Sequence, residues 1–504
     1  MPSDPLFQSG HLPWTVDATL ACLGPSALDA LPWTTAFDEM AAVEAGAHVN
    51  SDEDRQVGHY WLRAPETAPT IDIASAVANA ETAVRALAEG VASGRRLSPG
   101  GQKFSHLLHL GVGGSALGPQ LLVGALGANG LIVAFVDNTD PDGIERCLAA
   151  HDDFLGTTLV SVASKSGGTA ETRTALALVR ARFEAKGHRF AAHAIALTTE
   201  GSALDRVAAT EGWLARFPMW DFVGGRFSVT SCVGLLPAAL AGVDVSALLA
   251  GAAEMDAWTR APDWRSNPAA LLAGVWHVAG NGRGDRSLAV LPYSDRLLLL
   301  SRYLQQLVME SVGKRLDRAG NEVHQGLAVY GNKGSTDQHA FVQQLRDGRN
   351  DALTLFVQVL GDGVGPGVVV GPGRATAGDW LAGFLLGTRR ALKAGGRPTV
   401  TITVPGVDAR VLGGLIALFE RTVGLYAGLV GINAYHQPGV EAGKVAASEV
   451  LGLLDTLTSR LARPVGEAAL AKELGSDLVE TRYLLWRLRE TGRAKTDGVR
   501  WWAT

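Results

Sequence analysis

The residues best suited to chemistry lie in a turn at residues 164–169, with the sequence Ser-Lys-Ser-Gly-Gly-Thr. A short β-branched apolar run, Leu159–Ala163, precedes the turn and predicts a buried strand, while the alanine-rich residues from Ala170 onward predict a helix. A strand that turns tightly into a helix leaves backbone N–H groups free, and with hydroxyls and a lysine these donors suit a phosphate dianion. Because the turn lacks both the Walker spacing and a full GxGxxG pattern, a phosphosugar is favoured over a nucleotide. An ordinary polar loop is the alternative.

A second strand–turn–helix unit has the sequence Gly-Val-Gly-Gly-Ser-Ala-Leu-Gly-Pro at residues 111–119. It follows a predicted strand at 105–110. In parallel sheets, ligands gather where the carboxyl ends of the strands meet. We therefore expect Gly114 and Ser115 at the same sheet edge as the 164–169 turn.

Several further polar residues stand where they could support catalysis, although none is decisive alone. Glu310 lies near the end of an apolar helix with Gln306 one turn earlier, and burial would raise its pKa as a general base requires. His339 lies near a helix start, where an imidazole tends to stay neutral and can accept a proton. Arg226 occupies a glycine-rich turn, and Lys444 follows a Pro-Gly turn. Each is also compatible with a surface or structural role.

Composition excludes several classes of protein. The chain has 504 residues, 47% of them apolar and 19% charged, so it is long enough for more than one domain and is not disordered. A net charge of −5 argues against nucleic acid and anionic membranes as partners. The chain has no apolar run of about eighteen residues and no secretory signal pattern, so no membrane span is expected. The three scattered cysteines predict a reduced, cytoplasmic protein without a disulfide frame or metal site.

Strands alternate with helices along most of the chain, which predicts an α/β fold with doubly wound parallel sheets. The helices expected in the second half include 295–312 and 337–345. We expect a helical cover, two α/β domains and a small C-terminal extension, at residues 1–70, 71–245, 246–450 and 451–504. The extension has the element order of a winged helix. Its eight Lys/Arg and six Asp/Glu over residues 462–504 give only +2, so a packing or oligomer-contact role is favoured over DNA reading.

Read together, the motifs resemble the phosphoglucose isomerase (glucose-6-phosphate isomerase) family. The matching segments occur in the family's order and are GVGGSALGP at 111–119, SKSGGTAET at 164–172, GGRFSVTSCVGL at 224–235, ESVGK at 310–314, GSTDQHAFVQQL at 334–345 and QPGVEAGK at 437–444. The family fold is a pair of sugar-isomerase (SIS-type) domains, in agreement with the two α/β alternations.

The resemblance implies a role for each candidate residue. Glu310 would carry a proton between C1 and C2 of a hexose 6-phosphate, and Arg226 would stabilise the enediolate. His339, contributed by the partner subunit of a homodimer, and Lys444 would open the sugar ring. No cofactor or metal is implied. The residues implied in substrate binding are Gly114, Ser115, Ser164, Lys165, Ser166, Thr169, Gln306 and Gln437.

The sequence departs from the common family pattern at Ser166–Gly168, at Asp337 and at Tyr435–His436. The first departure leaves the hydroxyls of the turn in place, while the other two leave open a side activity on mannose 6-phosphate. A rival class is a non-catalytic phosphosugar sensor, against which Glu310, His339 and Lys444 together count. An amidotransferase half is disfavoured because no N-terminal cysteine nucleophile is present.

Overall fold

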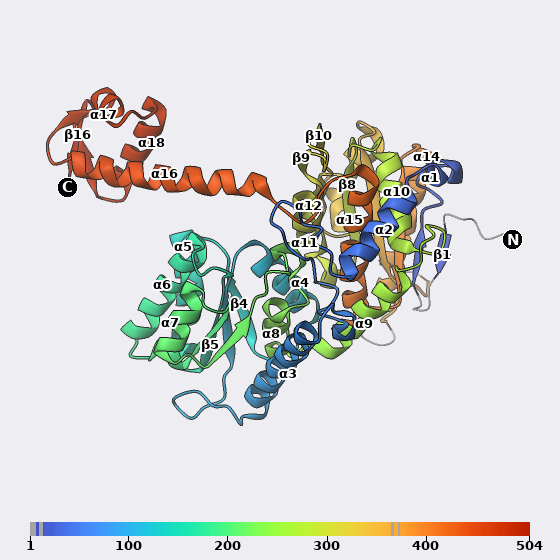
Figure 1. Ribbon diagram of the computed structural model, residues 1–504, viewed down its shortest axis with the longest axis horizontal. Helices are drawn as coiled ribbons and strands as arrows, with labels where there is room; N and C mark the ends of the chain where they lie inside the picture. Colours follow the sequence, from blue (N-terminus) through green and yellow to red (C-terminus); the bar gives the residue numbers. More distant parts are fainter. Residues whose placement is uncertain (1–6, 10–13, 364–366, 371–372) are drawn as a thin grey trace. The chain divides into compact units, whose positions relative to one another are not determined.

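In a computed structural model of the chain, the described residues are 7–9, 14–363, 367–370 and 373–504. The chain divides into two compact units, Met1–His436 and Gln437–Thr504 (Figure 1). The first unit contains two α/β sheets, as the sequence predicts. The second begins earlier than the extension expected at residue 451, because the helix α16 (Pro438–Arg460) runs through that position without a break.

The first sheet has the strand order β4-β3-β5-β6-β7, and its neighbouring strands run parallel. Alternate residues of each strand enter different cores, because successive side chains point to opposite faces. Leu108 and Val160 pack against α5, α6 and α7, whereas Leu107 and Leu159 join the core that contains α3, α4 and α8. The strands are Ile132–Val136, His106–Leu110, Thr158–Ala163, Ala194–Thr198 and Ala215–Pro218 in that order, and the helices α3 to α8 are Ile71–Ser93, Leu117–Leu126, Pro141–Ala149, Ala170–Ala185, Ala203–Glu211 and Cys232–Leu240.

The second sheet has the order β1-β2-β13-β12-β8-β11, and its central strands are parallel. Its inner face shares one continuous core with the first sheet, and its other face is covered by α13 and α14. The strands β8, β11, β12 and β13 are Ser287–Tyr293, Val329–Tyr330, Ala352–Val359 and Thr399–Val404, and the helices α9, α10, α13, α14 and α15 are Val245–Trp258, Pro268–Ala279, Val342–Asp347, Ala377–Ala394 and Ala409–Val430.

The N-terminal segment differs from the expected helical cover. It includes the helices α1 (Pro25–Asp29) and α2 (Trp33–Glu44), but it also adds β1 (Phe7–Ser9) and β2 (Thr15–Asp17) to the second sheet. The strand β2 pairs antiparallel with β13. The second sheet is therefore mixed, and its three-residue strands are too short to show an alternating pattern in the sequence.

The helix α15 forms the centre of the first unit. Its length and composition would allow it to cross a membrane, but its apolar window is fully buried inside the protein, as in the core helix of a globular fold. It carries Glu420 and Arg421, both with almost no exposed surface. Charged side chains at such positions require partners.

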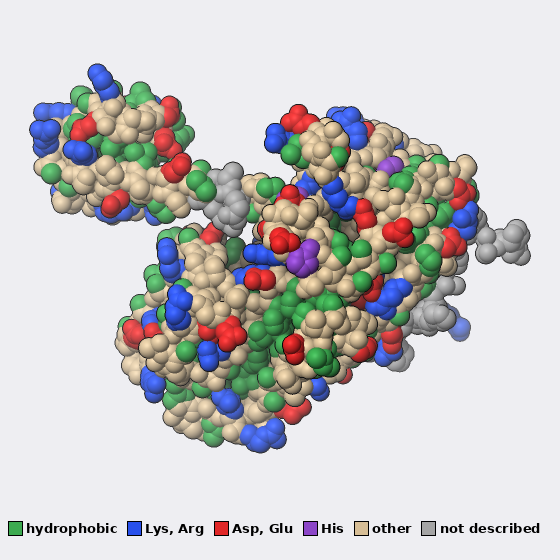
Figure 2. Space-filling model, viewed as in Figure 1, with side chains coloured by type: hydrophobic (Ala, Val, Ile, Leu, Met, Phe, Trp, Pro, Cys, Tyr) green, Lys and Arg blue, Asp and Glu red, His purple; other side chains and the backbone are tan. Residues whose placement is uncertain are grey.

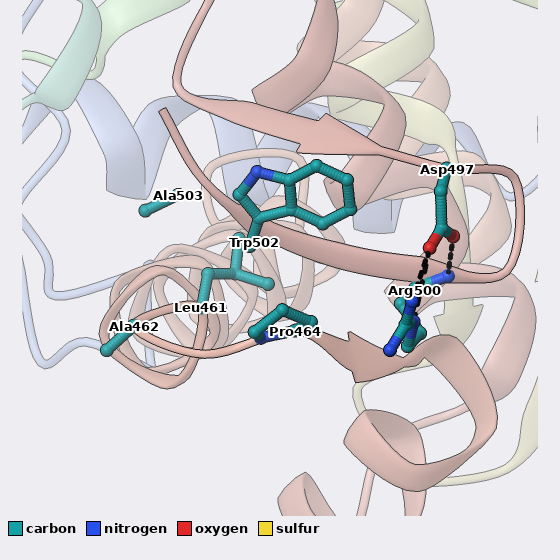
Figure 3. Close-up of a pocket in the computed structure, with 7 residues that line it drawn as sticks. All are labelled: Leu461, Ala462, Pro464, Asp497, Arg500, Trp502 and Ala503. Atoms are coloured by element: carbon teal, nitrogen blue, oxygen red, sulfur yellow. Dashed lines mark hydrogen bonds and ion pairs between the residues drawn. The ribbon is translucent and has the colours of Figure 1, made fainter.

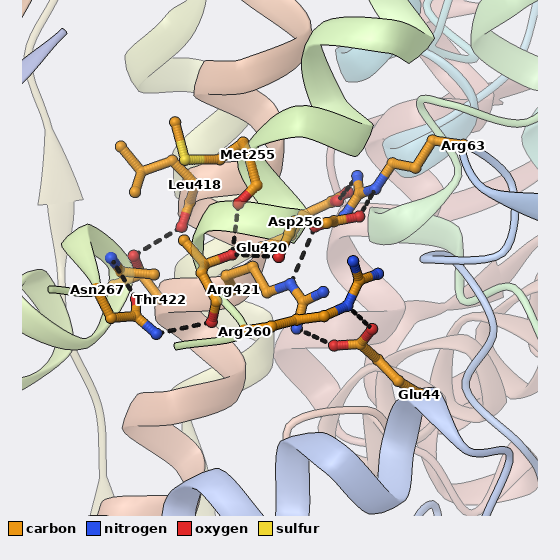
Figure 4. A network of polar contacts seen from close by, with 12 residues as sticks. Glu44, Arg63, Met255, Asp256, Arg260, Asn267, Leu418, Glu420, Arg421 and Thr422 are labelled. Atoms are coloured by element: carbon orange, nitrogen blue, oxygen red, sulfur yellow. Dashed lines mark hydrogen bonds and ion pairs between the residues drawn. The ribbon is translucent and has the colours of Figure 1, made fainter. Parts of the chain in front are cut away.

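The partners form a buried ionic network that joins the N-terminal segment to α9 and α15 (Figure 4). Asp256 on α9 accepts hydrogen bonds from Arg63 at 2.5 and 3.0 Å and from Arg421 at 2.9 Å. Arg63 also donates to Glu420 at 2.5 Å. The network therefore fixes residues 59–63 against the helical core.

Replacing Asp256 by asparagine is expected to lower the free energy of unfolding by about 3–5 kcal/mol, because two buried guanidinium groups lose their shared countercharge. Chemical denaturation followed by circular dichroism measures this loss. The matched control is Glu254→Gln on the same helix, whose exposed pairing with Arg410 predicts a change of no more than about 1 kcal/mol. Equal effects of the two substitutions would contradict the structural importance of the network.

The second unit has a winged-helix arrangement. After α16 come β14 (Val465–Gly466), α17 (Glu467–Leu474), α18 (Leu478–Glu490) and the hairpin strands β15 (Ala494–Thr496) and β16 (Arg500–Ala503). The three strands form an antiparallel sheet of order β14-β16-β15. Its core consists of Leu457, Leu461, Leu470, Leu485, Leu488, Ala494 and Trp501.

A shallow cavity of about 260 Å³ lies beside β16, with the Trp502 ring and the Asp497–Arg500 ion pair on its wall (Figure 3). The exposed surface of α18 carries Val479, Tyr483 and Trp486 together with Arg487 and Arg489. A packing or oligomer-contact role for this unit, in preference to DNA reading, stays a prediction. On the face of the first unit shown in Figure 2, acidic and basic side chains are interspersed.

Candidate active site

The turn at residues 164–169 joins the end of β5 to the start of α6, as the sequence predicts. Gly167 has φ +74°, and a side chain there would begin 2.5 Å from the backbone nitrogen of Leu204, so the position requires glycine. The Ser164 hydroxyl accepts a hydrogen bond from Gly167 N at 3.1 Å, and the Ser166 hydroxyl accepts one from Gly168 N at 3.0 Å. Thr169 precedes α6 without a side-chain cap. The N-terminus of this 16-residue helix thus retains the donors that suit an anion.

Lys165 connects this turn to the segment that leads to Arg226. Its ammonium donates to the backbone oxygens of Asp221 and Val223 at 3.3 and 3.4 Å and pairs with the Asp221 carboxylate at 3.3 Å. Burial lowers the pKa of Lys165, and Asp221 opposes that shift. The phosphate-type turn and the Arg226 segment are therefore held together by a cation.

The glycine-rich turn after β3 lies against the same segment. A side chain at Gly114 would begin 2.0 Å from the backbone oxygen of Gly225, and one at Gly113 would begin 3.0 Å from Nε2 of Gln306. Ser115 ends the short helix Gly113–Ser115, and its backbone oxygen is hydrogen-bonded to His109 at 2.7 Å. Since β3 and β5 are parallel neighbours, the two turns share one sheet edge.

Arg226 is buried at the centre of this arrangement, in the short helix Gly225–Phe227. Its Nε donates to the Ser311 hydroxyl at 2.7 Å, and Nη2 donates to the backbone oxygens of Ala434 and, at 3.1 Å, His436. Nη1 lies 3.8 Å from Oε2 of Glu310. Burial lowers the pKa of Arg226 to about 10, against the opposing effect of the Glu310 carboxylate, so the group stays charged at neutral pH.

Glu310 does not lie on the continuous helix expected at 295–312. The segment consists of a 3₁₀ turn, Asp295–Leu297, then α11 (Leu300–Leu304), a π-helical stretch (Gln305–Met309) and α12 (Glu310–Val312). A π-helical stretch is frequent at functional sites, and hydrophobic spacing alone does not reveal it. Gln306 Nε2 still reaches Oε2 of Glu310 at 3.4 Å, and the Glu310 side chain is 27% exposed. The carboxylate is therefore both accessible and close to Arg226.

Two residues near Glu310 were not singled out from the sequence. Ser311 holds Arg226 through its hydroxyl, and Lys314 donates a 2.5 Å hydrogen bond from Nζ to the backbone oxygen of Glu310. Lys314 begins β9 (Lys314–Leu316), which pairs with β10 (Glu322–Gln325). The spacing of Lys314, four residues after Glu310, is the one feature of the sequence that could have indicated its contact with the candidate base.

His339 is exposed at the end of a 3₁₀ turn, Thr336–His339, and not within the helix expected at 337–345. Asp337, two residues before His339, is buried and accepts hydrogen bonds from the backbone and side-chain nitrogens of Asn332 at 2.8 and 3.2 Å. Both of its carboxylate oxygens are therefore hydrogen-bonded within the loop.

The last two candidates, Gln437 and Lys444, belong to the second unit. Gln437 is the N-cap of α16, but Lys444 does not begin a helix as expected, because α16 already begins at Pro438 and the Pro-Gly pair forms its first two residues. The side chain of Lys444 lies outside the described residues. Among the described residues, no group of three or more His, Cys, Asp or Glu side chains is placed to hold a metal ion.

Comparison with known proteins decides the family. The phosphoglucose isomerase family model matches residues 27–360 and 387–461, which is well over half of the chain. The chain belongs to the phosphoglucose isomerase family. The six motifs that suggested this family from the sequence all begin within the matched residues.

Individual relatives agree with the family match. The glucose-6-phosphate isomerase of Synechococcus elongatus is 55% identical, with 91% of this chain and 88% of the relative covered. That of Synechococcus sp. strain JA-2-3B'a(2-13) is 52% identical over 97% of this chain and 94% of its own length, so the similarity extends into residues 462–504. The crystal structure of a glucose-6-phosphate isomerase from Chlamydia trachomatis matches with a TM-score of 0.80 at 28% identity, with 89% of this chain and 90% of that one covered. The phosphoglucose isomerase fold is thus shared over most of the chain.

Proposed function

We propose that this protein interconverts D-glucose 6-phosphate and D-fructose 6-phosphate in glycolysis and gluconeogenesis, through ring opening and a cis-enediolate. The observation that carries the proposal is the contact of the partly exposed Glu310 carboxylate with the buried Arg226 guanidinium at 3.8 Å. An accessible base beside a fixed cation is what proton transfer next to a carbonyl requires. Membership of the phosphoglucose isomerase family supports the choice of substrate. The sensor alternative is not favoured, since it needs neither group.

In the proposed reaction, the Glu310 carboxylate removes the proton from C2 of the open-chain aldose. The electron pair of the broken C–H bond forms the C1–C2 double bond, and the carbonyl oxygen on C1 takes up negative charge. Arg226 stabilises that charge, because its fixed guanidinium needs little reorganisation as the charge develops. Glu310 then returns the proton to C1 while the hydroxyl proton on O2 is transferred to O1. No net oxidation occurs, so the step needs no redox cofactor, and in the proposal Arg226 rather than a metal stabilises the charge.

The sugar phosphate is proposed to bind the 164–169 turn, with contacts from Ser164, Lys165, Ser166 and Thr169. Gly114 and Ser115 would line the same pocket. Binding energy from this remote phosphate positions the reacting carbons. Gln306 and Gln437 would orient the sugar hydroxyls, and the hydrogen bond from Gln306 to Glu310 supports this role.

Ring opening is assigned to His339 and Lys444. We propose that the protein is a homodimer in which His339 enters the site of the partner subunit. The exposure of His339 and its lack of a hydrogen-bond partner within the described residues support a role across an interface. We further propose that the enzyme acts in the cytoplasm.

The proposal is tested with the purified protein and glucose 6-phosphate, mannose 6-phosphate or fructose 6-phosphate in buffer with a chelator. Formation of fructose 6-phosphate from glucose 6-phosphate, measured by a coupled assay, is the expected result. Turnover that depends strictly on added metal would contradict the proposed mechanism, and binding without any turnover would favour the sensor.

Replacing Ser164 and Thr169 together by alanine is expected to raise KM for glucose 6-phosphate by about 10–100-fold. Two hydroxyl contacts to a charged phosphate are lost, each worth about 1.5–3 kcal/mol before partial compensation by water. Inhibition by inorganic phosphate should weaken in parallel. The matched control is Ser93→Ala with Thr210→Ala, two exposed positions on helices of the same sheet. Unchanged inhibition by inorganic phosphate in the Ser164→Ala, Thr169→Ala variant would contradict the assignment of the 164–169 turn as the phosphate-binding site.

A further inference from the structure

Lys314 is a buried cation next to the segment of the proposed base, and the proposed mechanism gives it no role. Lys314 is 5% exposed, although lysine is among the residues least often buried in proteins. It stands directly after Gly313, at the point where the segment that bears Glu310 ends. Such a position needs an explanation, because an ammonium removed from water is costly unless it is hydrogen-bonded or paired.

The hydrogen bond of Lys314 explains part of this burial. Helix ends leave backbone carbonyls without intrahelical partners. Lys314 Nζ supplies the donor for the Glu310 carbonyl at 2.5 Å, while Gly313 N donates to Met309 O at 2.9 Å. The adjacent residue, Ser311, is held by Arg226. The backbone at Glu310 is thus fastened from both sides, although α12 is only three residues long and follows a π-helical stretch.

The charges around Lys314 come from several parts of the fold. Arg226 acts on it from the 225–227 turn, Glu310 from α12 and Asp52 from the loop before α3, and Lys314 in turn acts on His436. Burial and the Arg226 charge lower the pKa of Lys314 to about 7, and the two carboxylates oppose the shift. The lysine is therefore charged below neutral pH and loses its charge as the pH rises.

We propose that Lys314 is a positioning residue for proton transfer by Glu310: its ammonium fixes the backbone that aims the carboxylate and adds a second positive charge beside Arg226. This inference rests on the proposed isomerase function. A small displacement of a catalytic group can cost two orders of magnitude in rate, so removal of the anchor affects kcat more than substrate binding.

The experiment compares the wild-type protein with Lys314→Met and Lys314→Arg, and with Lys495→Met in the second unit as a matched control. The quantities measured are kcat and KM from about pH 6 to about pH 9, with thermal unfolding of each variant. Loss of the anchor in Lys314→Met is expected to lower kcat by about 10–100-fold at neutral pH, with KM changed by less than about threefold. Lys495→Met should retain wild-type values.

The pH dependence separates this role from simple packing. Arginine keeps its charge over this range, whereas Lys314 loses it above about pH 7. The ratio of kcat/KM for Lys314→Arg to that of the wild type should therefore rise with pH. Over the same range, the difference in kcat/KM between the wild type and Lys314→Met should become smaller. Wild-type kcat in Lys314→Met, or ratios that do not change with pH, would overturn the proposal. If Lys314→Met does not fold, the comparison of Lys314→Arg with the wild type decides.

The experiment also distinguishes failure of this inference from failure of the proposed function. A wild-type protein that does not turn over glucose 6-phosphate contradicts the isomerase assignment and with it the role of Lys314. A wild-type protein that turns over normally, with Lys314→Met equally active, contradicts only the positioning role.

Discussion

Replacing Glu310 by glutamine is expected to reduce kcat by about 10⁴-fold, at the upper end of the range for general acid–base catalysis. Glutamine preserves the shape of the side chain, and its amide can still contact Gln306 and Arg226, but it cannot accept the proton from C2. The same carboxylate is proposed to remove the proton from C2 and return it to C1, so both proton-transfer steps lose their base. The coupled assay at saturating substrate measures the effect.

Binding should survive this substitution. Binding is measured with a fluorescent or radiolabelled sugar phosphate that inorganic phosphate displaces. The dissociation constant of inorganic phosphate is expected to stay within about threefold of the wild-type value, because the phosphate contacts are remote from Glu310. Glu322→Gln is the matched control, since Glu322 is exposed on β10 and pairs with Arg315 at 3.2 Å. A Glu310→Gln protein that retains more than a tenth of wild-type kcat would exclude Glu310 as the base.

The second large effect is expected at Arg226. Its replacement by lysine should lower kcat by about 10²–10³-fold, the usual cost of removing a donor to a developing oxyanion. Lysine keeps a positive charge but lacks the planar fork, so it cannot serve Ser311, Ala434 and the substrate oxygen together. A transition-state-like inhibitor, such as a sugar-acid phosphate, should lose affinity in proportion to kcat/KM, whereas inorganic phosphate should not.

The matched control for Arg226 is Arg189→Lys, an exposed position in the same α/β domain. Because Arg226 is buried and bridges several parts of the fold, thermal unfolding of Arg226→Lys is measured in parallel. Equal losses of affinity for the sugar-acid phosphate and for inorganic phosphate would indicate a general distortion of the site, and would contradict a specific role in stabilising the enediolate.

The central parallel strands of the two sheets were predictable because their patterns are local. Leu159–Ala163 is a continuous apolar run, and Ala170 starts a helix directly after a glycine-containing turn, so the position of the phosphate-type turn followed from both. The parallel topology then brought Gly114 to the same edge. These are the cases in which propensity and tertiary packing favour the same structure.

The internal geometry of the site was not predictable in the same way. The apolar spacing of 295–312 is helical, yet the segment includes a 3₁₀ turn and a π-helical stretch, because the hydrophobic pattern does not record which hydrogen bond each N–H makes. Lys314 has the spacing of an ordinary solvated lysine, and only the fold shows that its ammonium is buried.

Contacts between distant segments were also invisible in the sequence. His59 is buried, and its ring stacks on Phe227 with centroids 4.5 Å apart, directly beside Arg226. Burial and the nearby Arg63 lower the pKa of His59, so the ring stays neutral. The network around Asp256 holds this segment in place from α9. His59 and Asp256 lie in none of the six motifs, and their contact partners lie far away along the chain.

The close approach of Gly114 to Gly225 has a consequence for protein engineering. With the carbonyl of one turn only 2.0 Å from where a β-carbon of the other would stand, even alanine at position 114 would force the arginine-bearing turn to shift. Libraries that aim to widen the range of accepted sugars should leave this pair of glycines untouched and diversify the exposed rim instead. Loss of turnover in such a Gly114→Ala clone would report a displaced guanidinium, and it would carry no information about which sugars the cleft admits.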